Sequence, residues 1–193
     1  FFQHLLTNNT AVQATFTPAG VVYQIRPQDK VIAVMLGSQP AVQSTIAYVQ
    51  NFIQLLNGRN FAFTYHFFVY CANHVADTNS LFQRVCETIK KELLVPAPIN
   101  VVPMSYQTED VIAQLLARSN ITITRSGGGT IMELLGVAKG QTWVHSETKE
   151  PAAAEEKLLA GIPFWEAGNA LYLKKMRQGR LVTPQTFGKY LEI

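Results

Sequence analysis

The residues best suited to chemistry lie in one stretch, residues 120–133, with the sequence NITITRSGGGTIME. The β-branched run 121–124 is typical of a strand. Residues 126–129 form a glycine-rich turn, and Thr130 can cap a helix that begins at about Ile131. Glycines let the backbone approach an anion, and the free amides at a helix start point toward it. Strand, turn and helix in this order predict a phosphate-binding site.

Glu133 lies about one turn into this helix and is expected to face the same predicted binding site. A carboxylate repels phosphate but accepts hydrogen bonds from a ribose diol, as the acidic residue of dinucleotide-binding folds does. A tight strand-to-helix connection would also use glycine, but three in a row exceed that need and weaken the ends of both elements. We therefore expect a bound ligand here, and we expect Gly128 to adopt a positive φ that a β-branched residue resists.

This stretch resembles the donor-binding domain of GT-B glycosyltransferases, which are built from two Rossmann-like halves. It is most similar to the branch containing the bacterial lipid-II N-acetylglucosaminyltransferase and the diacylglycerol glycosyltransferases. In that branch a strand ends in Arg-Ser-Gly, followed by two variable residues, Thr, two more residues and Glu. The corresponding positions here are Arg125, Ser126, Gly127, Thr130 and Glu133. The resemblance implies that a nucleotide diphosphate sugar, expected to be a UDP-sugar, binds at this turn, with Gly128 and Gly129 at the diphosphate and Glu133 on the ribose.

A second loop is expected to reach the same ligand. The continuously apolar run 31–36 is typical of a parallel strand buried on both faces, and a helix with apolar residues at helical spacing is expected over 41–56. Between them, the related enzymes also have Gly-Ser-Gln, which implies that Gly37, Ser38 and Gln39 approach the diphosphate or the sugar. The same tripeptide is also a common turn. Parallel sheets bind ligands at the carboxyl ends of their strands, which favours a meeting of the two loops.

Two further places extend the resemblance. In the related enzymes the loop after the third strand holds the nucleobase, largely through backbone groups, which implies Met104 and Ser105 here; an ordinary connecting loop is the alternative. A later region of those enzymes has Gln or an acid, two residues and Asn-Ala, and Glu166 and Asn169 match it. The first of these commonly contacts the donor sugar. Glu in place of Gln keeps hydrogen-bond acceptors but loses donors, which leaves the sugar identity open.

The remaining pattern alternates strands with helices. Strands are expected at 61–71, 99–103, 141–145 and 181–182, and helices at 81–94, 110–117, 131–137, 164–176 and from 183 onward. Short connections in this order predict an α/β fold with a doubly wound, Rossmann-like parallel sheet. We expect residues 1–30 to be an interdomain connection or a packed N-terminal segment. Residues 31–193 would form the donor-binding domain, a single half of the GT-B architecture.

No catalytic residue is assigned. His66 lies within a strand and is expected to pack in the core, and nothing in the sequence pairs with His74. His145 ends a strand beside the expected site, but no acid or nucleophile is visibly paired with it. The general base of related enzymes normally lies in the other half. We therefore expect this chain to bind a nucleotide and to catalyse little without that half.

Composition narrows the remaining classes of function. Hydrophobic residues make up 48% and charged residues 15%, which indicates an ordinary core. The net charge of +3 is too small to predict a nucleic-acid partner, and no apolar run approaches a membrane span of roughly 18 residues. Cys71 and Cys86 lack metal-type spacing and are expected to be reduced thiols of a cytoplasmic protein. There is no Asp-x-Asp motif, and no metal or other cofactor is expected.

The leading hypothesis is the donor-binding half of a glycosyltransferase that transfers a hexose from a UDP-sugar. The chain begins with Phe1 rather than Met, and we expect an N-terminal acceptor domain to be missing, with any peripheral membrane contact made through that missing half. One alternative is a sugar-nucleotide 2-epimerase, which shares the fold and a Ser-Gly-Gly turn but typically has two adjacent acids after it, where only Glu133 occurs. Another is a non-catalytic nucleotide-binding module. A dehydrogenase is disfavoured because no Gly-x-Gly-x-x-Gly follows the first strand.

Overall fold

The computed structural model describes residues 25–37, 41–72, 80–94, 98–148, 154–176 and 179–191. The strands are β1 (Lys30–Met35), β2 (Tyr65–Tyr70), β3 (Ile99–Met104), β4 (Ile121–Thr124), β5 (Gln141–His145) and β6 (Leu181–Val182). The helices are α2 (Val42–Leu56), α3 (Leu81–Glu92), α4 (Glu109–Arg118), α5 (Gly128–Val137), α6 (Glu155–Ala160), α7 (Phe164–Met176) and the 3-10 helix η1 (Phe187–Tyr190). Most of the N-terminal segment 1–30, together with Ser38, Gln39 and His74, lies outside the described residues.

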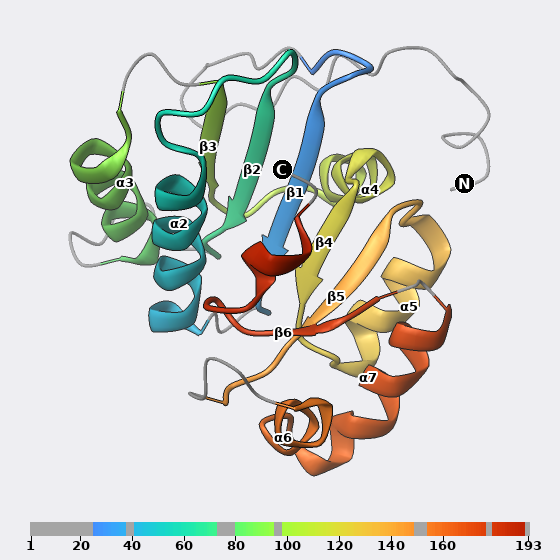
Figure 1. Ribbon diagram of the computed structural model, residues 1–193. Helices are drawn as coiled ribbons and strands as arrows, with labels where there is room; N and C mark the ends of the chain where they lie inside the picture. The colour runs from blue at the N-terminus through green and yellow to red at the C-terminus, as the bar shows by residue number, and fades with distance from the viewer. Residues whose placement is uncertain are drawn as a thin grey trace.

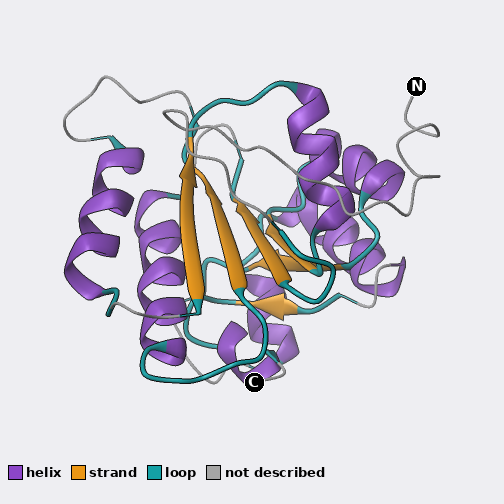
Figure 2. Ribbon diagram, turned by 90° about the horizontal axis from the view of Figure 1, so that it is seen from above, coloured by secondary structure: helices purple, strands orange, loops and turns teal. Residues whose placement is uncertain are grey.

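The described strands form one parallel sheet in the order β3-β2-β1-β4-β5-β6, and helices cover both of its faces (Figures 1 and 2). The chain starts in the middle of the sheet and moves outward in one direction through β2 and β3. It then returns to the other side of β1 and moves outward again through β4, β5 and β6. The expected α/β fold with a doubly wound, Rossmann-like parallel sheet is confirmed.

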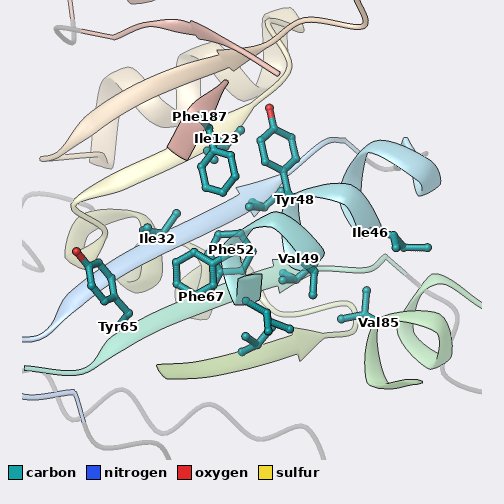
Figure 3. Packing of buried hydrophobic residues seen from close by; sticks show 14 of the residues in the cluster. Ile32, Ile46, Tyr48, Val49, Phe52, Tyr65, Phe67, Val85, Ile123 and Phe187 are labelled. Atoms are coloured by element: carbon teal, nitrogen blue, oxygen red, sulfur yellow. The ribbon is translucent and has the colours of Figure 1, made fainter. Parts of the chain in front are cut away.

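One face of the sheet packs against α2, α3 and η1 around aromatic side chains. Phe52 of α2 stacks on Phe67 of β2 with ring centroids 4.1 Å apart, and Tyr48 meets Phe187 edge-on at 5.2 Å (Figure 3). Ile32 of β1 belongs to the same cluster. These side chains are buried and exclude water from this half of the core, which is the main source of stability for such a domain.

The other face of the sheet is covered by α4, α5 and α7. Val31 and Ala33, the neighbours of Ile32 along β1, pack there with Leu115 of α4. Further along the sheet, Ala170 and Leu173 of α7 share a cluster with strand residues of β5 and β6. Because successive residues of a strand point to opposite faces and both faces are covered, β1 must be apolar from Val31 onward, as its sequence indicated.

The largest difference from the predicted elements concerns the glycine turn. Helix α5 begins at Gly128, and its N-cap is Gly127 (φ −64°, ψ 144°), so the expected start at Ile131 with a Thr130 cap is wrong. Gly128 and Gly129 belong to the first helical turn. The expected positive φ at Gly128 is also wrong, since among the described glycines only Gly37 and Gly58 have one. An extended residue followed by free amides is enough to start a helix, and Gly127 provides it.

Two other boundaries differ. Strand β2 begins at Tyr65 rather than at residue 61, because Phe61 and Phe63 pack on each other and on Tyr65 before the strand starts. The segment after β6 forms a turn and η1 instead of a helix from residue 183. The amide of Thr183 donates to Thr186 Oγ1 at 2.9 Å, which holds this turn.

A network of polar side chains closes the amino-terminal edge of the sheet. Asp29 accepts hydrogen bonds from the backbone amides of Arg26 (2.8 Å) and Thr64 (3.0 Å) and from Arg26 Nη2 (3.0 Å), and His66 Nε2 lies 3.3 Å away. Arg118 Nη2 donates to the carbonyls of Arg26 and Asp29, both at 2.9 Å. Burial opposes ionisation of Asp29, but these hydrogen bonds hold the pKa of its carboxyl well below the usual range. Burial lowers the pKa of His66, although Asp29 opposes this effect.

Two further observations concern the cysteines and the helices. Cys71 and Cys86 are free, as expected, and burial raises the pKa of Cys71 to about 12. Within the described ranges, no helix combines the length and the apolar character needed to cross a membrane.

Candidate functional site

The two predicted ligand-binding loops leave the sheet side by side. Strand β1 pairs with β4 so that Met35 lies opposite Thr124, which brings the start of each loop to the same place at the carboxyl edge. Gly37 has a φ of +96°, a left-handed conformation that glycine adopts without strain. Gly37 is the described part of this loop, since Ser38 and Gln39 lie outside the described residues.

The start of α5 presents an open surface. The first backbone amides of a helix have no partner within the helix and carry the positive end of its dipole. A Cβ atom built on Gly127, Gly128 or Gly129 would meet no protein atom within 4 Å. Gly128 and Gly129 are exposed. The space beside these three backbone positions is therefore open, and a larger side chain could occupy it without disturbing the protein.

Three predicted site residues from two distant segments meet beside this helix start. Asn169 Nδ2 donates to the carbonyl of Ser126 at 3.1 Å, and Ser126 Oγ lies 3.5 Å from Glu166 Oε2. Ser126 is buried, whereas Glu166 is only half-buried. Helix α7 is thus attached to the turn after β4. It places the Glu166 carboxylate beside Ser126, which directly precedes the N-cap residue of α5.

A cavity of about 710 Å³ opens between α4, α5 and the carboxyl ends of β1 and β2. Gly37, Thr130 and Glu133, all predicted site residues, lie on its wall. Helix α5 therefore connects the free amides at its start to the cavity along a single face. The exposed side chain of Glu133 lies on the cavity wall, about one turn from the amides.

The rest of the cavity wall combines aromatic, apolar and polar side chains. It includes Tyr70, Tyr106, Gln107, Ile112, Leu116 and Val137. The volume lies within the range of small-molecule sites, which are typically concave and mostly apolar with a few polar groups.

Met104 and Ser105, the predicted nucleobase contacts, are not on this wall. Strand β3 extends through Met104, whose side chain is buried and whose carbonyl accepts a 2.7 Å hydrogen bond from the Cys71 amide. The placement of Met104 in a loop is therefore wrong, because edge pairing with β2 continues to the end of the apolar run. Tyr106 and Gln107 follow directly and do line the cavity. The signal that sequence analysis missed was an aromatic residue in a short loop after a strand.

Arg125 and His145 take part in a second group at the same edge. His145 Nε2 lies 3.3 Å from Glu147 Oε2, and the Tyr48 hydroxyl lies 3.1 Å from His145 Nδ1. Ser44 Oγ donates to Glu147 Oε2 at 3.4 Å. His145 above all, with a contribution from Arg125, lowers the pKa of Glu147, whose side chain remains 43% exposed.

The prediction that no acid pairs with His145 is wrong. Glu147 follows it by two residues, and in extended chain such residues point the same way. Glu147 was not among the predicted site residues, and the partner from α2 was not predictable from the sequence. Across the described part of the chain, no group of three His, Cys, Asp or Glu side chains is arranged to hold a metal ion.

Comparisons with known proteins do not assign this chain to a family. No model of a known protein family matches this chain, and no curated protein matches it. A search of solved structures finds similarity to the crystal structure of UDP-GlcNAc 2-epimerase from Neisseria meningitidis bound to UDP-GlcNAc. The two chains share 16% identity and a TM-score of 0.47, and the match covers 85% of this chain. This chain spans 42% of the length of that protein.

Proposed function

We propose that this chain is a nucleotide-sugar-binding domain and that it forms one half of a GT-B-like enzyme acting on a UDP-sugar. The observation that carries the proposal is the continuous path along α5, from free amides at open glycines, past Glu133, to the cavity. A nucleotide diphosphate has the same order of groups, with phosphates, ribose and base in sequence.

The diphosphate is assigned to the start of α5. Backbone amides and the helix dipole stabilise negative charge there without a bound cation. Gly127, Gly128 and Gly129 let phosphate oxygens come close because these positions carry no side chain and the space beside them is open. Thr130 adds a hydroxyl on the same side, where it lines the cavity.

The nucleoside is assigned to the cavity. The Glu133 carboxylate accepts hydrogen bonds from the ribose diol, and Tyr106 and Ile112 offer flat and apolar surfaces to the base. The sugar extends the other way, toward Glu166 and Glu147. Carboxylates there accept hydrogen bonds from its hydroxyl groups.

Two reactions use such a ligand. Sugar transfer to an acceptor is the reaction implied by the motif Arg125-Ser126-Gly127 with Thr130 and Glu133. Epimerisation at C2 is the second candidate, and one geometric observation favours it. Epimerases typically have two adjacent acids after the Ser-Gly-Gly turn, where this sequence has only Glu133, but the fold brings a second carboxylate, Glu166, to 3.5 Å from Ser126 Oγ.

Calorimetry with UDP tests the shared binding proposal through Gly128→Val. The new side chain meets no protein atom, so the stability should change by no more than about 0.5 kcal/mol. It fills the phosphate position, and UDP affinity should fall by about tenfold or more. Gly168→Val is the matched control, since this exposed helical glycine also has open space around it. Wild-type protein that does not bind UDP, or a folded Gly128→Val variant with unchanged affinity, contradicts the proposal.

A product assay separates the two reactions. UDP-GlcNAc is incubated with the chain and then examined for its C2 epimer, for free UDP and for transferred sugar. Formation of the epimer with the nucleotide still attached supports the epimerase. Release of UDP that depends on an added acceptor supports the transferase.

A further inference from the structure

Helix α7 carries an apolar surface that faces away from the protein. Seven of its residues are exposed, and five of these are large and apolar: Phe164, Trp165, Leu171, Tyr172 and Met176. The other two are Gly168 and Lys175. Phe164 is 91% exposed and Trp165 79% exposed, so both project almost completely from the molecular surface.

The exposed residues lie on one side of the helix. At about 100° per residue, positions 164, 168, 171, 172 and 175 fall within a single sector. The opposite side carries Ala170 and Leu173, which are buried in the cluster with β5 and β6. A helix that is apolar on both sides is normally buried on both. Figure 1 shows α7 at the outside of the molecule.

The charges of this surface bear on what could cover it. None of the seven exposed residues is acidic, and Lys175 provides one positive charge. Lys174 lies beside it and pairs with Glu155 of α6. An acid-free surface with a lysine complements an anionic one.

The composition also distinguishes a lipid surface from a protein partner. Trp and Tyr are enriched where a membrane meets water, and lysine extends its charge past an apolar layer to the head groups. Protein interfaces share the aromatic enrichment but are depleted in lysine. We propose that the exposed side of α7 binds the interface of a bilayer that contains anionic lipids, with the helix axis parallel to the membrane plane.

The dimensions of the helix agree with this orientation. Thirteen residues span about 20 Å, too short to cross a bilayer but sufficient to lie within one leaflet. The proposed membrane contact lies on this chain, whereas the sequence analysis expected any such contact on a further half. Because Glu166 and Asn169 of the same helix contact Ser126, the bound membrane would also lie next to the candidate site.

Tryptophan fluorescence tests the proposal, because the chain has two tryptophans in contrasting surroundings. Trp143 is 1% exposed and Trp165 is 79% exposed, so a change on adding lipid reports on Trp165. The chain is titrated with vesicles of phosphatidylcholine alone and with vesicles that also contain phosphatidylglycerol. We expect a blue shift and co-sedimentation with the anionic vesicles, and weaker binding to the neutral ones and at high salt.

A double variant and a control variant locate the contact. Phe164→Ser with Leu171→Ser keeps the Trp165 probe and should weaken vesicle binding about tenfold. Leu94→Ser removes an apolar residue that is 63% exposed elsewhere, and should leave vesicle binding unchanged. Circular dichroism checks that both variants fold. Binding that is lost equally in both, or absent in the folded wild type, overturns the proposal. A dimer in solution that only the α7 variant disrupts, without vesicle binding, assigns the surface to a second copy and also overturns it.

Discussion

The two edges of the parallel sheet carry polar side chains in opposite states. At the amino edge, the Asp29 side chain is 1% exposed and receives donors from Arg26, Thr64 and His66 at 2.8–3.3 Å. At the carboxyl edge, the Glu133 carboxylate is exposed, and the Ser126–Glu166 contact is 3.5 Å long. Polar groups that the protein itself satisfies support the fold, whereas groups left open are the ones a ligand can use.

The direction of the chain produces this difference. In a parallel α/β sheet the strands all end at one edge, and the following helices start there, so free amides collect at that edge. At the other edge, helices end and strands begin. There Arg118, the last residue of α4, reaches the carbonyls of Arg26 and Asp29 and closes the network. Substitutions at the two edges should therefore affect different quantities.

The largest effect is expected for Asp29→Ala. It removes a buried acceptor and leaves Arg26, Thr64 and His66 without their partner, which should lower the free energy of unfolding by about 3 kcal/mol. Urea unfolding measures this change. Asp110→Ala is the control, because this exposed acid in the first turn of α4 should contribute less than about 1 kcal/mol. Equal effects at the two positions would remove the distinction between the closed network and an ordinary surface acid.

Glu133→Gln should leave stability unchanged and weaken ligand binding. A carboxylate–hydroxyl hydrogen bond shielded from water contributes roughly 1.5–3 kcal/mol. The affinity for UDP should fall accordingly, and the loss should be much smaller for 2′-deoxy-UDP, which lacks one of the two hydroxyl groups. Calorimetry of both proteins with both ligands gives the coupling. If the two ligands lose the same affinity, Glu133 does not contact the 2′-hydroxyl.

Glu147→Gln should weaken binding of the sugar without affecting binding of the nucleotide. Its carboxylate is oriented by His145 and Ser44 and remains partly exposed, so it can accept a hydrogen bond from the sugar but not from free UDP. We expect about a fivefold loss of affinity for UDP-GlcNAc and none for UDP. Glu156→Gln, at an exposed position of α6, is the control for the change in charge. A similar loss for both ligands would place Glu147 near the diphosphate instead.

The smallest effect is expected in the pH dependence of stability. The pKa of His66 is lowered in the folded protein, so as pH falls through 6.5 the unfolded state takes up a proton that the folded state does not. Stability should therefore decrease on acidification, by at most about 1 kcal/mol between about pH 7 and pH 5.5. His66→Gln should show a flatter dependence in urea unfolding over this range. The same slope in both proteins would assign the acid sensitivity to other groups.

Sequence periodicity predicted the architecture well because local patterns carry it. The apolar run of β1, the helical spacing in α2 and the alternation of elements each depend on nearby residues, and each lies close to its predicted position. Boundaries were less accurate where a tertiary contact decided them. Strand β3 extends through Met104 because β2 continues to pair with it, and Gly128 is helical because Gly127 already provides the extended residue before the helix.

The candidate site likewise combines features that the sequence predicted with features that depend on tertiary contacts. The sequence by itself determined that a strand, a glycine turn and a helix follow one another, and this order is enough to place Gly127, Thr130 and Glu133 along one helix start. Only the tertiary structure decided what surrounds that start. The approach of Glu166 and Asn169 to Ser126, the pairing of His145 with Tyr48 and the cavity wall of Tyr106 depend on how separate elements pack. Hydrogen bonds and burial act between groups that are close in space, and the sequence specifies which groups are close only through the completed fold.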